Sequence, residues 1–90
     1  MRGLAPRQQH VAERMYRYRV DVDVPQQGFG TRITDIIRWC EEHRGQGNWE
    51  SHTHQTAGQR RMRYYFEDRD VAYAFATYTA DLNSTFSERR

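Results

Sequence analysis

The stretch that decides the fold is RRMRYYF, residues 60–66. Its apolar side chains Met62, Tyr64 and Phe66 alternate with charged or polar ones. This period of two predicts a β-strand that buries one face. The residues that follow, beginning with Asp68, have a helical pattern. We therefore expect this strand to be central in a small sheet and to lead directly into a helix.

A second strand with the same alternation is predicted at residues 15–24. Its apolar positions are Tyr16, Tyr18, Val20, Val22 and Val24, and its polar positions are Arg17, Arg19, Asp21 and Asp23. β-Branched and aromatic residues suit a pleated, packed surface. The opposite face of this strand is charged, and Pro25 ends it.

A third strand, at residues 48–55, forms a hairpin with the stretch 60–66. Trp49 marks the face that points inward, and His52 and His54 lie on the other face. The turn is formed by residues 56–59, where Gly58 takes the backbone angle that a tight hairpin requires. The two strands are therefore expected to be antiparallel neighbours.

Two amphipathic helices complete the pattern. Their apolar stripes are Ile33, Ile36, Ile37 and Cys40 in a helix from 32 to about 43, and Val71, Ala74, Phe75, Tyr78 and Leu82 in a helix after Asp68. Spacings of three and four residues place each set on one helical face. Thr31 and Asp68 are residue types that cap helix N-termini.

The element order β-α-β-β-α predicts a two-layer α+β sandwich. We expect a three-stranded antiparallel sheet with two helices on one face, which is a truncated ferredoxin-like fold. One domain spans residues 14–86, with flexible tails at 1–13 and 87–90. The first strand is then an exposed edge, and a long regular edge needs protection or a partner. This predicts a homodimer through the edge of the first strand.

Composition excludes several classes of protein. No apolar run approaches the 18 residues of a membrane span, the N-terminus has no apolar signal region, and Cys40 has no second cysteine to pair with. These absences predict a cytoplasmic protein. All 14 basic residues are arginines, but 12 acidic residues leave a net charge of only +2. We interpret the arginine bias as that of a GC-rich bacterial genome, so nucleic acid is a possible partner but not the favoured one.

The charged sheet face is the first candidate site. Its candidate binding residues are Arg17, Arg19, His52, His54, Arg61, Arg63 and Tyr65. Arginines interleaved with an aromatic ring can hold single-stranded RNA through phosphate contacts and stacking. The alternative is a solvated face with cross-strand ion pairs between Asp21 or Asp23 and the arginines of the opposite strand.

Part of this region is similar to a known RNA-binding family. Residues 64–68, followed by a helix with Ala72 and Phe75, resemble the third strand and second helix of an RNA-recognition motif. The strand lacks the glycine–aromatic spacing of that family, and the first strand has charges where the family has aromatics. The chain is therefore not assigned to that family.

The second candidate is the loop before the first helix. Gly28, Gly30, Thr31 and Arg32 lie at a helix N-terminus, where free amides favour an anion or a small ligand. The spacing matches neither a Rossmann nor a Walker loop, and a glycine turn with a capping threonine explains it equally well. Phe29 at the loop tip is a candidate contact anchor.

Metal and catalytic sites are not predicted. Cys40, His43, His52 and His54 are zinc-type ligands, but the strand alternation places Cys40 on the sheet face opposite His52 and His54. Ser51 lies next to His52 in sequence, and neighbours in a strand point in opposite directions. We therefore expect no cofactor and no enzymatic activity. The favoured function is a protein-interaction module, with a second copy or another protein as partner.

Overall fold

The structure, a computed structural model, describes residue 12 and residues 15–89. Its elements are β1 (Tyr18–Asp23), α2 (Arg32–Glu42), β2 (Trp49–Thr56), β3 (Gln59–Phe66), α3 (Arg69–Tyr78) and β4 (Thr85–Glu88). Short 3₁₀ turns follow the two helices at η1 (Arg44–Gln46) and η2 (Ala80–Leu82). Apart from Ala12, the predicted tail at residues 1–13 lies outside the described residues.

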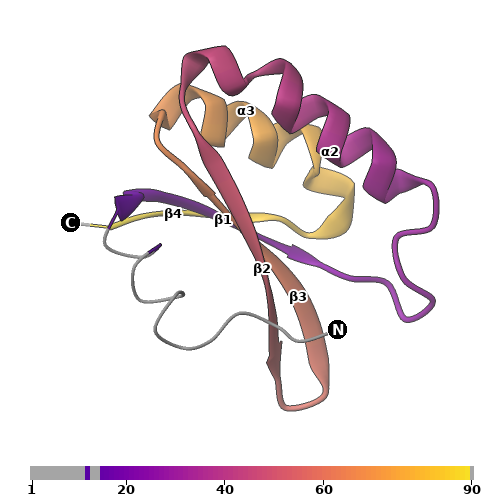
Figure 1. The fold of residues 1–90 in the computed structure, drawn as a ribbon. Coiled ribbons are helices and arrows are strands. Elements are labelled where there is room, and N and C mark those ends of the chain that lie inside the picture. Colours follow the sequence, from indigo (N-terminus) through magenta and orange to yellow (C-terminus); the bar gives the residue numbers. More distant parts are fainter. Residues whose placement is uncertain (1–11, 13–14, 90) are drawn as a thin grey trace.

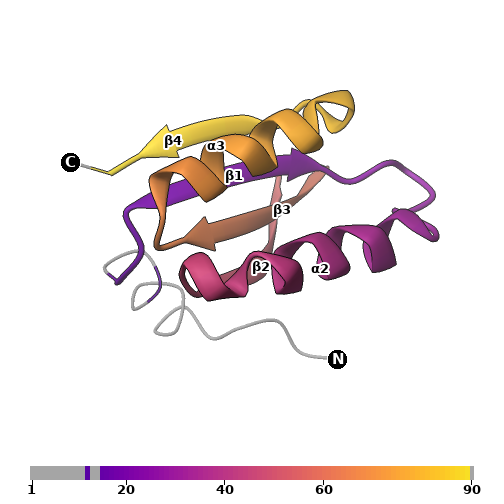
Figure 2. The same ribbon diagram turned by 90° about the horizontal axis from the view of Figure 1, so that it is seen from above.

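The strands form one antiparallel sheet in the order β2-β3-β1-β4 (Figure 1). Both helices lie on the same face of the sheet. Viewed from above, α3 covers β1 and β4, and α2 lies on the β2 side (Figure 2). The predicted α+β class is confirmed, as is the position of β3 between β1 and β2.

The sheet has one strand more than the sequence analysis expected. β4 pairs with β1 from Tyr18–Glu88 to Asp21–Thr85, so β1 is an inner strand and its edge is occupied. The prediction of a three-stranded sheet with β1 at its edge is wrong. Consequently, the predicted dimer contact through β1 has no free edge to use. Ser87 and Glu88, expected in a tail, belong to this strand.

The short strand β4 is held by aromatic contacts. Phe86 stacks on Tyr18 of β1, with ring centroids 6.4 Å apart, and meets Tyr73 of α3 edge-on at 5.9 Å. The chain enters β4 through Asn83, which adopts a left-handed conformation with φ of 54°. Asparagine tolerates this conformation better than most residues. Four residues with one half-buried aromatic ring give a weak strand pattern.

The core lies between the sheet and the helices. Its buried residues are Val20 and Val22 of β1, Tyr64 and Phe66 of β3, Ile36 and Cys40 of α2, and Val71, Ala72 and Phe75 of α3. The predicted alternation is therefore confirmed within β1 and β3. The assignment of Tyr16 to the same face is wrong, because Tyr16 lies before β1 and packs with Tyr65 in a separate cluster. Phe75 joins α3 to the sheet, because its ring centroid lies 4.7 Å from that of Tyr64 and 5.1 Å from that of Phe66, both in β3.

The helix stripes differ in part from the predicted ones. In α3, Ala72 is buried and Ala74 is exposed, so the assignment of Ala74 to the core is wrong. In α2, Ile37 remains 46% exposed although it belongs to the predicted stripe. Among the described residues, no helix is long and apolar enough to cross a membrane.

The two helix N-termini are capped differently. The backbone N–H of Val71 donates to Oδ2 of Asp68 at 2.9 Å, so the predicted cap of α3 is confirmed. Thr31 occupies the corresponding position before α2, but its side chain makes no capping hydrogen bond. Its backbone is already helical, with φ of −70° and ψ of −14°, which is not the extended geometry of a capping residue. The predicted capping role of Thr31 is wrong.

This difference predicts the effect of two matched substitutions. Asp68→Ala should lower the free energy of unfolding by about 1 kcal/mol, the typical loss of an N-cap side chain. Thr31→Ala should change it by only a few tenths, because no capping bond is lost. Urea unfolding followed by circular dichroism measures both. Equal losses for the two variants would contradict the assignment of the caps.

Candidate functional site

The sheet face opposite the helices, which we call the open face, collects charged side chains from neighbouring strands. Its residues are Arg17, Arg19, Asp21 and Asp23 from β1 and its N-terminal flank, Glu50, His52 and His54 from β2, and Arg61, Arg63 and Tyr65 from β3. The register places His52, Arg63 and Asp21 in one row across three strands. The candidate binding residues of this face therefore do lie together.

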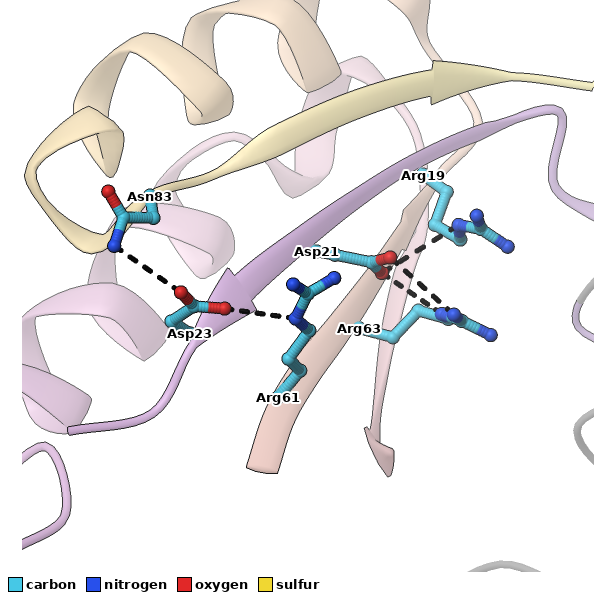
Figure 3. Close-up of polar contacts among 6 residues, drawn as sticks. All are labelled: Arg19, Asp21, Asp23, Arg61, Arg63 and Asn83. Atoms are coloured by element: carbon cyan, nitrogen blue, oxygen red, sulfur yellow. Dashed lines mark hydrogen bonds and ion pairs between the residues drawn. The ribbon is translucent and has the colours of Figure 1, made fainter. Parts of the chain in front are cut away.

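Asp21 is the charged centre of the open face. The Nε–H of Arg63 donates to its Oδ1 at 2.9 Å, and Nε of Arg19 lies 3.7 Å from the same oxygen (Figure 3). Asp21 is only 8% exposed, so this carboxylate needs its partners. One carboxylate thus serves two guanidinium groups, and Arg63 contacts both of its oxygens.

Asp23 makes a second set of cross-strand contacts. Nε of Arg61 lies 3.0 Å from its Oδ1, and the side-chain amide of Asn83 donates to its Oδ2 at 3.3 Å (Figure 3). The interpretation of this face as one with cross-strand ion pairs is therefore confirmed for both aspartates. Arg61 and Arg63 are bound to acids of the same chain, which reduces what they offer to a phosphate.

Tyr65 is not available as an exposed stacking surface. It is 2% exposed and forms a small second core with Ala12 and Tyr16. Its ring centroid lies 6.3 Å from that of Tyr16. Burial and the nearby Glu50 carboxylate raise the pKa of Tyr16. The segment before β1 therefore covers part of the face that the sequence analysis expected to be open.

His52 is the most constrained titratable group on the open face. It is 6% exposed, and neither ring nitrogen has a hydrogen-bond partner among the described residues. Burial lowers its pKa, and the Glu50 carboxylate, 3.8 Å from Nε2, offsets part of this effect. The Tyr65 ring packs against it at 5.3 Å. Burial of the imidazole therefore disfavours its protonation.

In the loop before α2, the predicted anion ligand Arg32 is already bonded to other groups of the chain. Arg32, the predicted anion ligand, donates to both carboxylate oxygens of Asp81, at 2.8 and 3.1 Å, and to the carbonyl of Tyr78. Gly28 and Gly30 provide the turn, with φ of 86° and 60°. Phe29, expected as a contact anchor or a packed residue, is half-buried against the core.

The cysteine and the histidines are far from forming one cluster. Cys40 is buried in the main core, and burial raises the pKa of its thiol to about 12. The His43 ring stacks on Trp39 at 3.8 Å, and its Nδ1 hydrogen-bonds the Trp39 carbonyl. Within the part of the chain that the structure describes, no group of three or more histidine, cysteine and acidic residues could hold a metal ion.

A hollow at the β1–β4 end of the open face was missed by the sequence analysis. Its volume is about 280 Å³, and its lining residues are Tyr16, Arg17, Arg19, Tyr65, Ser87, Glu88 and Arg89. Ser87 and Arg89 were not predicted as site residues, because residues 87–90 were interpreted as a flexible tail. The alternation of Phe86 with Thr85 and Ser87 was the available signal.

The two outer strands differ in their free backbone groups. The N–H of Glu67 donates to the carbonyl of Asn48 at 3.1 Å, which makes this a hydrogen-bonded pair of the β2–β3 ladder. Because such pairs alternate, the even-numbered residues of β2 bond to β3 and the odd-numbered ones point outward. The backbone N–H and C=O groups of β2 that point away from β3 are thus those of Trp49, Ser51, Thr53 and Gln55.

No protein-family model, curated protein or solved structure matches this chain. Its own residues are therefore the basis of the functional proposals below.

The ion pairs predict unequal effects of removing the two arginines. Arg63→Ala leaves the nearly buried Asp21 with only the longer ion pair to Arg19, at 3.7 Å. It should lower the free energy of unfolding by roughly 2 kcal/mol, discounted for partial solvent access. Arg61→Ala removes a half-exposed partner and should cost under about 1 kcal/mol. Urea unfolding measures both, and a larger loss for Arg61→Ala would contradict the central role of Asp21.

The environment of His52 predicts a pH-dependent stability. A lowered pKa in the folded state means that the unfolded chain binds the proton more readily. Neutral His52 therefore contributes to the stability of the fold above its unfolded-state pKa of about 6.5. This contribution is lost as the pH falls toward the lower pKa of His52 in the folded state. Facing groups are Glu50, Arg63, Tyr65 and Tyr16. Between pH 7 and 5, the free energy of unfolding of His52→Gln, measured with urea, should vary less with pH than that of the unmodified chain.

The matched control is His54→Gln, which leaves His52 in place. This variant should retain the pH dependence of the unmodified protein in the same urea unfolding series. A pH dependence that disappears in His54→Gln and persists in His52→Gln would contradict the assignment.

Proposed function

We propose that the chain is a non-catalytic protein-interaction module of ferredoxin-like architecture, which forms a homodimer through the edge of β2. The order β-α-β-β-α-β with strands arranged β2-β3-β1-β4 supports this architecture. The dimer contact differs from the one expected through β1, whose edge is filled by β4. The proposal therefore moves the contact to the other side of the sheet.

The observation that carries the proposal is the length and composition of the β2 edge. β2 has eight residues, whereas the opposite edge strand β4 has four. Natural proteins protect edge strands with proline, cationic side chains or short length. The sequence of β2, WESHTHQT, contains no proline, lysine or arginine. Its four outward-pointing backbone positions are thus a ready template for another strand.

The sequence of β2 suits a second copy of the same strand. If two β2 strands pair antiparallel around a two-fold axis at His52, Ser51 lies opposite Thr53 of the second copy, and both have outward-pointing backbone groups. Glu50 then lies opposite His54 of the second copy, twice by symmetry. An acid opposite an imidazole is a favourable cross-strand pair. An isologous contact of this kind closes after two copies.

The helix side of the β2 edge adds apolar surface to the same contact. Trp49 of β2 donates its Nε1–H to Glu41 of α2 at 3.0 Å, which holds the helix beside this strand. Ile37 on α2 is 46% exposed. Nearby, Thr53 and Met62 line a hollow of about 300 Å³ with residues of the loop before α2. A second copy along β2 would cover part of this surface.

Two other functions are supported less well. Single-stranded RNA binding on the open face relied on Arg17, Arg19, Arg61, Arg63 and Tyr65. Arg61 and Arg63 are paired to aspartates, Arg19 lies 3.7 Å from Asp21, and Tyr65 is buried. An anion at the loop of residues 28–31 relied on Arg32, whose guanidinium is held by Asp81. Neither function has a specific observation in its favour.

The dimer is tested by a proline on the β2 edge. Thr53→Pro removes an outward-pointing N–H without removing a bond of the β2–β3 ladder, and proline is tolerated at such edge positions. We expect the unmodified protein to sediment as a dimer and Thr53→Pro to sediment as a folded monomer. Analytical ultracentrifugation measures the mass, and circular dichroism verifies the fold.

The matched control is Glu88→Pro on the β4 edge. The N–H of Arg89 donates to the carbonyl of Arg17 at 2.7 Å, so by the same alternation the N–H of Glu88 points outward. Glu88→Pro should remain a dimer. A monomeric unmodified protein at high micromolar concentration, or a Thr53→Pro variant that remains a dimer, would overturn the proposal.

A further inference from the structure

We infer that the hollow between β3 and the loop before α2 binds a small apolar carboxylate, of the kind of a medium-chain fatty acid, and we call it the apolar hollow. Its lining includes the apolar side chains of Val24, Phe29, Ile33 and Met62, together with Arg60. The inference combines two features of this place. It is a mostly apolar space, and it contains one cation that has no acidic partner in the described chain.

The apolar hollow lies where the helix layer no longer covers the sheet. The far end of the β2–β3 hairpin extends away from both helices (Figure 1). On the helix side of β3, Tyr64 and Phe66 are buried in the core, whereas Met62 is only half-buried. Phe29 of the loop and Ile33 of the first turn of α2 supply further walls. Apolar side chains therefore surround this space without a helix that fills it.

Arg60 places a positive charge at the apolar hollow. It lies two residues before Met62 within β3, so the two side chains share the helix side of the sheet. Its cross-strand neighbour in β2 is Gln55. Its backbone carbonyl accepts the N–H of Val24 at 3.0 Å, which fixes Val24 beside it. The guanidinium group thus comes from a regular strand whose position is set on both sides.

Arg60 differs in its surroundings from the neighbouring arginines of its strand. Arg61 and Arg63 project to the open face, where the two aspartates of β1 neutralise them. Among the described residues, Arg60 forms no ion pair. Within the same part of the chain, no acidic residue lines the apolar hollow or the adjoining hollow that shares Val24 and Arg60 with it. A bound anion would supply the missing partner.

A carboxylate with an apolar chain matches both features. Ligand sites are typically lined by apolar side chains, with a few polar groups that orient the ligand. The planar fork of one guanidinium group fits the two oxygens of a carboxylate and balances its single charge, whereas a phosphate ester carries more charge than one arginine can balance. The volume of about 300 Å³ is at the lower end of the usual range of about 300–1,000 Å³, which suits a short chain.

The inference goes beyond the proposed dimer and beyond the anion site expected at the loop of residues 28–31. The loop site relied on Arg32, which is held by Asp81, whereas the charge here comes from β3. Thr53 lines the apolar hollow and also belongs to the β2 edge. Ligand binding is therefore tested through Arg60, and the dimer through Thr53.

The test is an amide NMR titration of the ¹⁵N-labelled full chain with butanoate, hexanoate and octanoate at neutral pH and constant sodium concentration. We expect saturable shifts at residues 29, 33, 53 and 62. Each added methylene should tighten binding about fourfold, the effect of burying one such group. Hexan-1-ol and hexylammonium have the same chain without the negative charge, and both should bind more weakly than hexanoate.

Arg60→Gln should weaken octanoate binding about tenfold, the effect of losing a charge-assisted hydrogen bond, and should leave the binding of hexan-1-ol unchanged. The Arg60 side chain is exposed, so this variant should keep the fold, which circular dichroism verifies. The matched control is Arg38→Gln, which removes an exposed arginine of α2 that lies 3.7 Å from Asp35. Its affinity for octanoate should equal that of the unmodified protein.

Four results would overturn the inference: no saturable shift at the apolar hollow up to about 10 mM octanoate, an affinity that does not rise with chain length, hexylammonium binding as tightly as hexanoate, or equal affinities of Arg60→Gln and Arg38→Gln for octanoate. Sedimentation of the protein without ligand tests the dimer separately. A monomer that binds octanoate would overturn the dimer alone, and a dimer that does not bind octanoate would overturn this inference alone.

Discussion

The pairing of β1 with β3 determines both faces of this protein. Its register, from Tyr18–Phe66 to Asp23–Arg61, sends Val20 and Tyr64 under the helices and joins Asp21 to Arg63 on the other face. A slip of one residue would move every side chain to the wrong face. It would then bury charges beneath α3 and expose the core. The nearly buried ion pair thus contributes to specifying the register, as well as to stability.

The charged side chains of the sheet are paired with one another mainly at its centre. In the centre, Asp21 and Asp23 neutralise Arg63 and Arg61 of β3, and burial lowers the pKa of His52. At the β2 edge, the strand has few charges, and the backbone groups of its odd-numbered residues point away from β3. Within the described part of the chain, compensation of charge is therefore concentrated at the centre of the sheet.

Much of the fold could be predicted because strong alternation marks β1 and β3, and because Asp68 begins a clear helical pattern. β4 could not be predicted in the same way, since its four residues contain one half-buried aromatic, Phe86, and follow a helix end. Without β4, the edge of the sheet was assigned to the wrong strand. The open-face residues were identified from alternation alone. Their mutual neutralisation and the burial of Tyr65 depend on register and on residues before β1, which no local pattern reveals.

The position of β4 beside β1 also has a consequence for folding. Tyr18 pairs with Glu88, seventy residues later in the chain, and with Phe66 on its other side. Contacts this distant in sequence slow folding, because a long loop must close before they form. At about 5–20 residues per second, a ribosome would make β1 several seconds before β4. During that interval β1 would have an unpaired edge, and it would be the segment most in need of protection from aggregation.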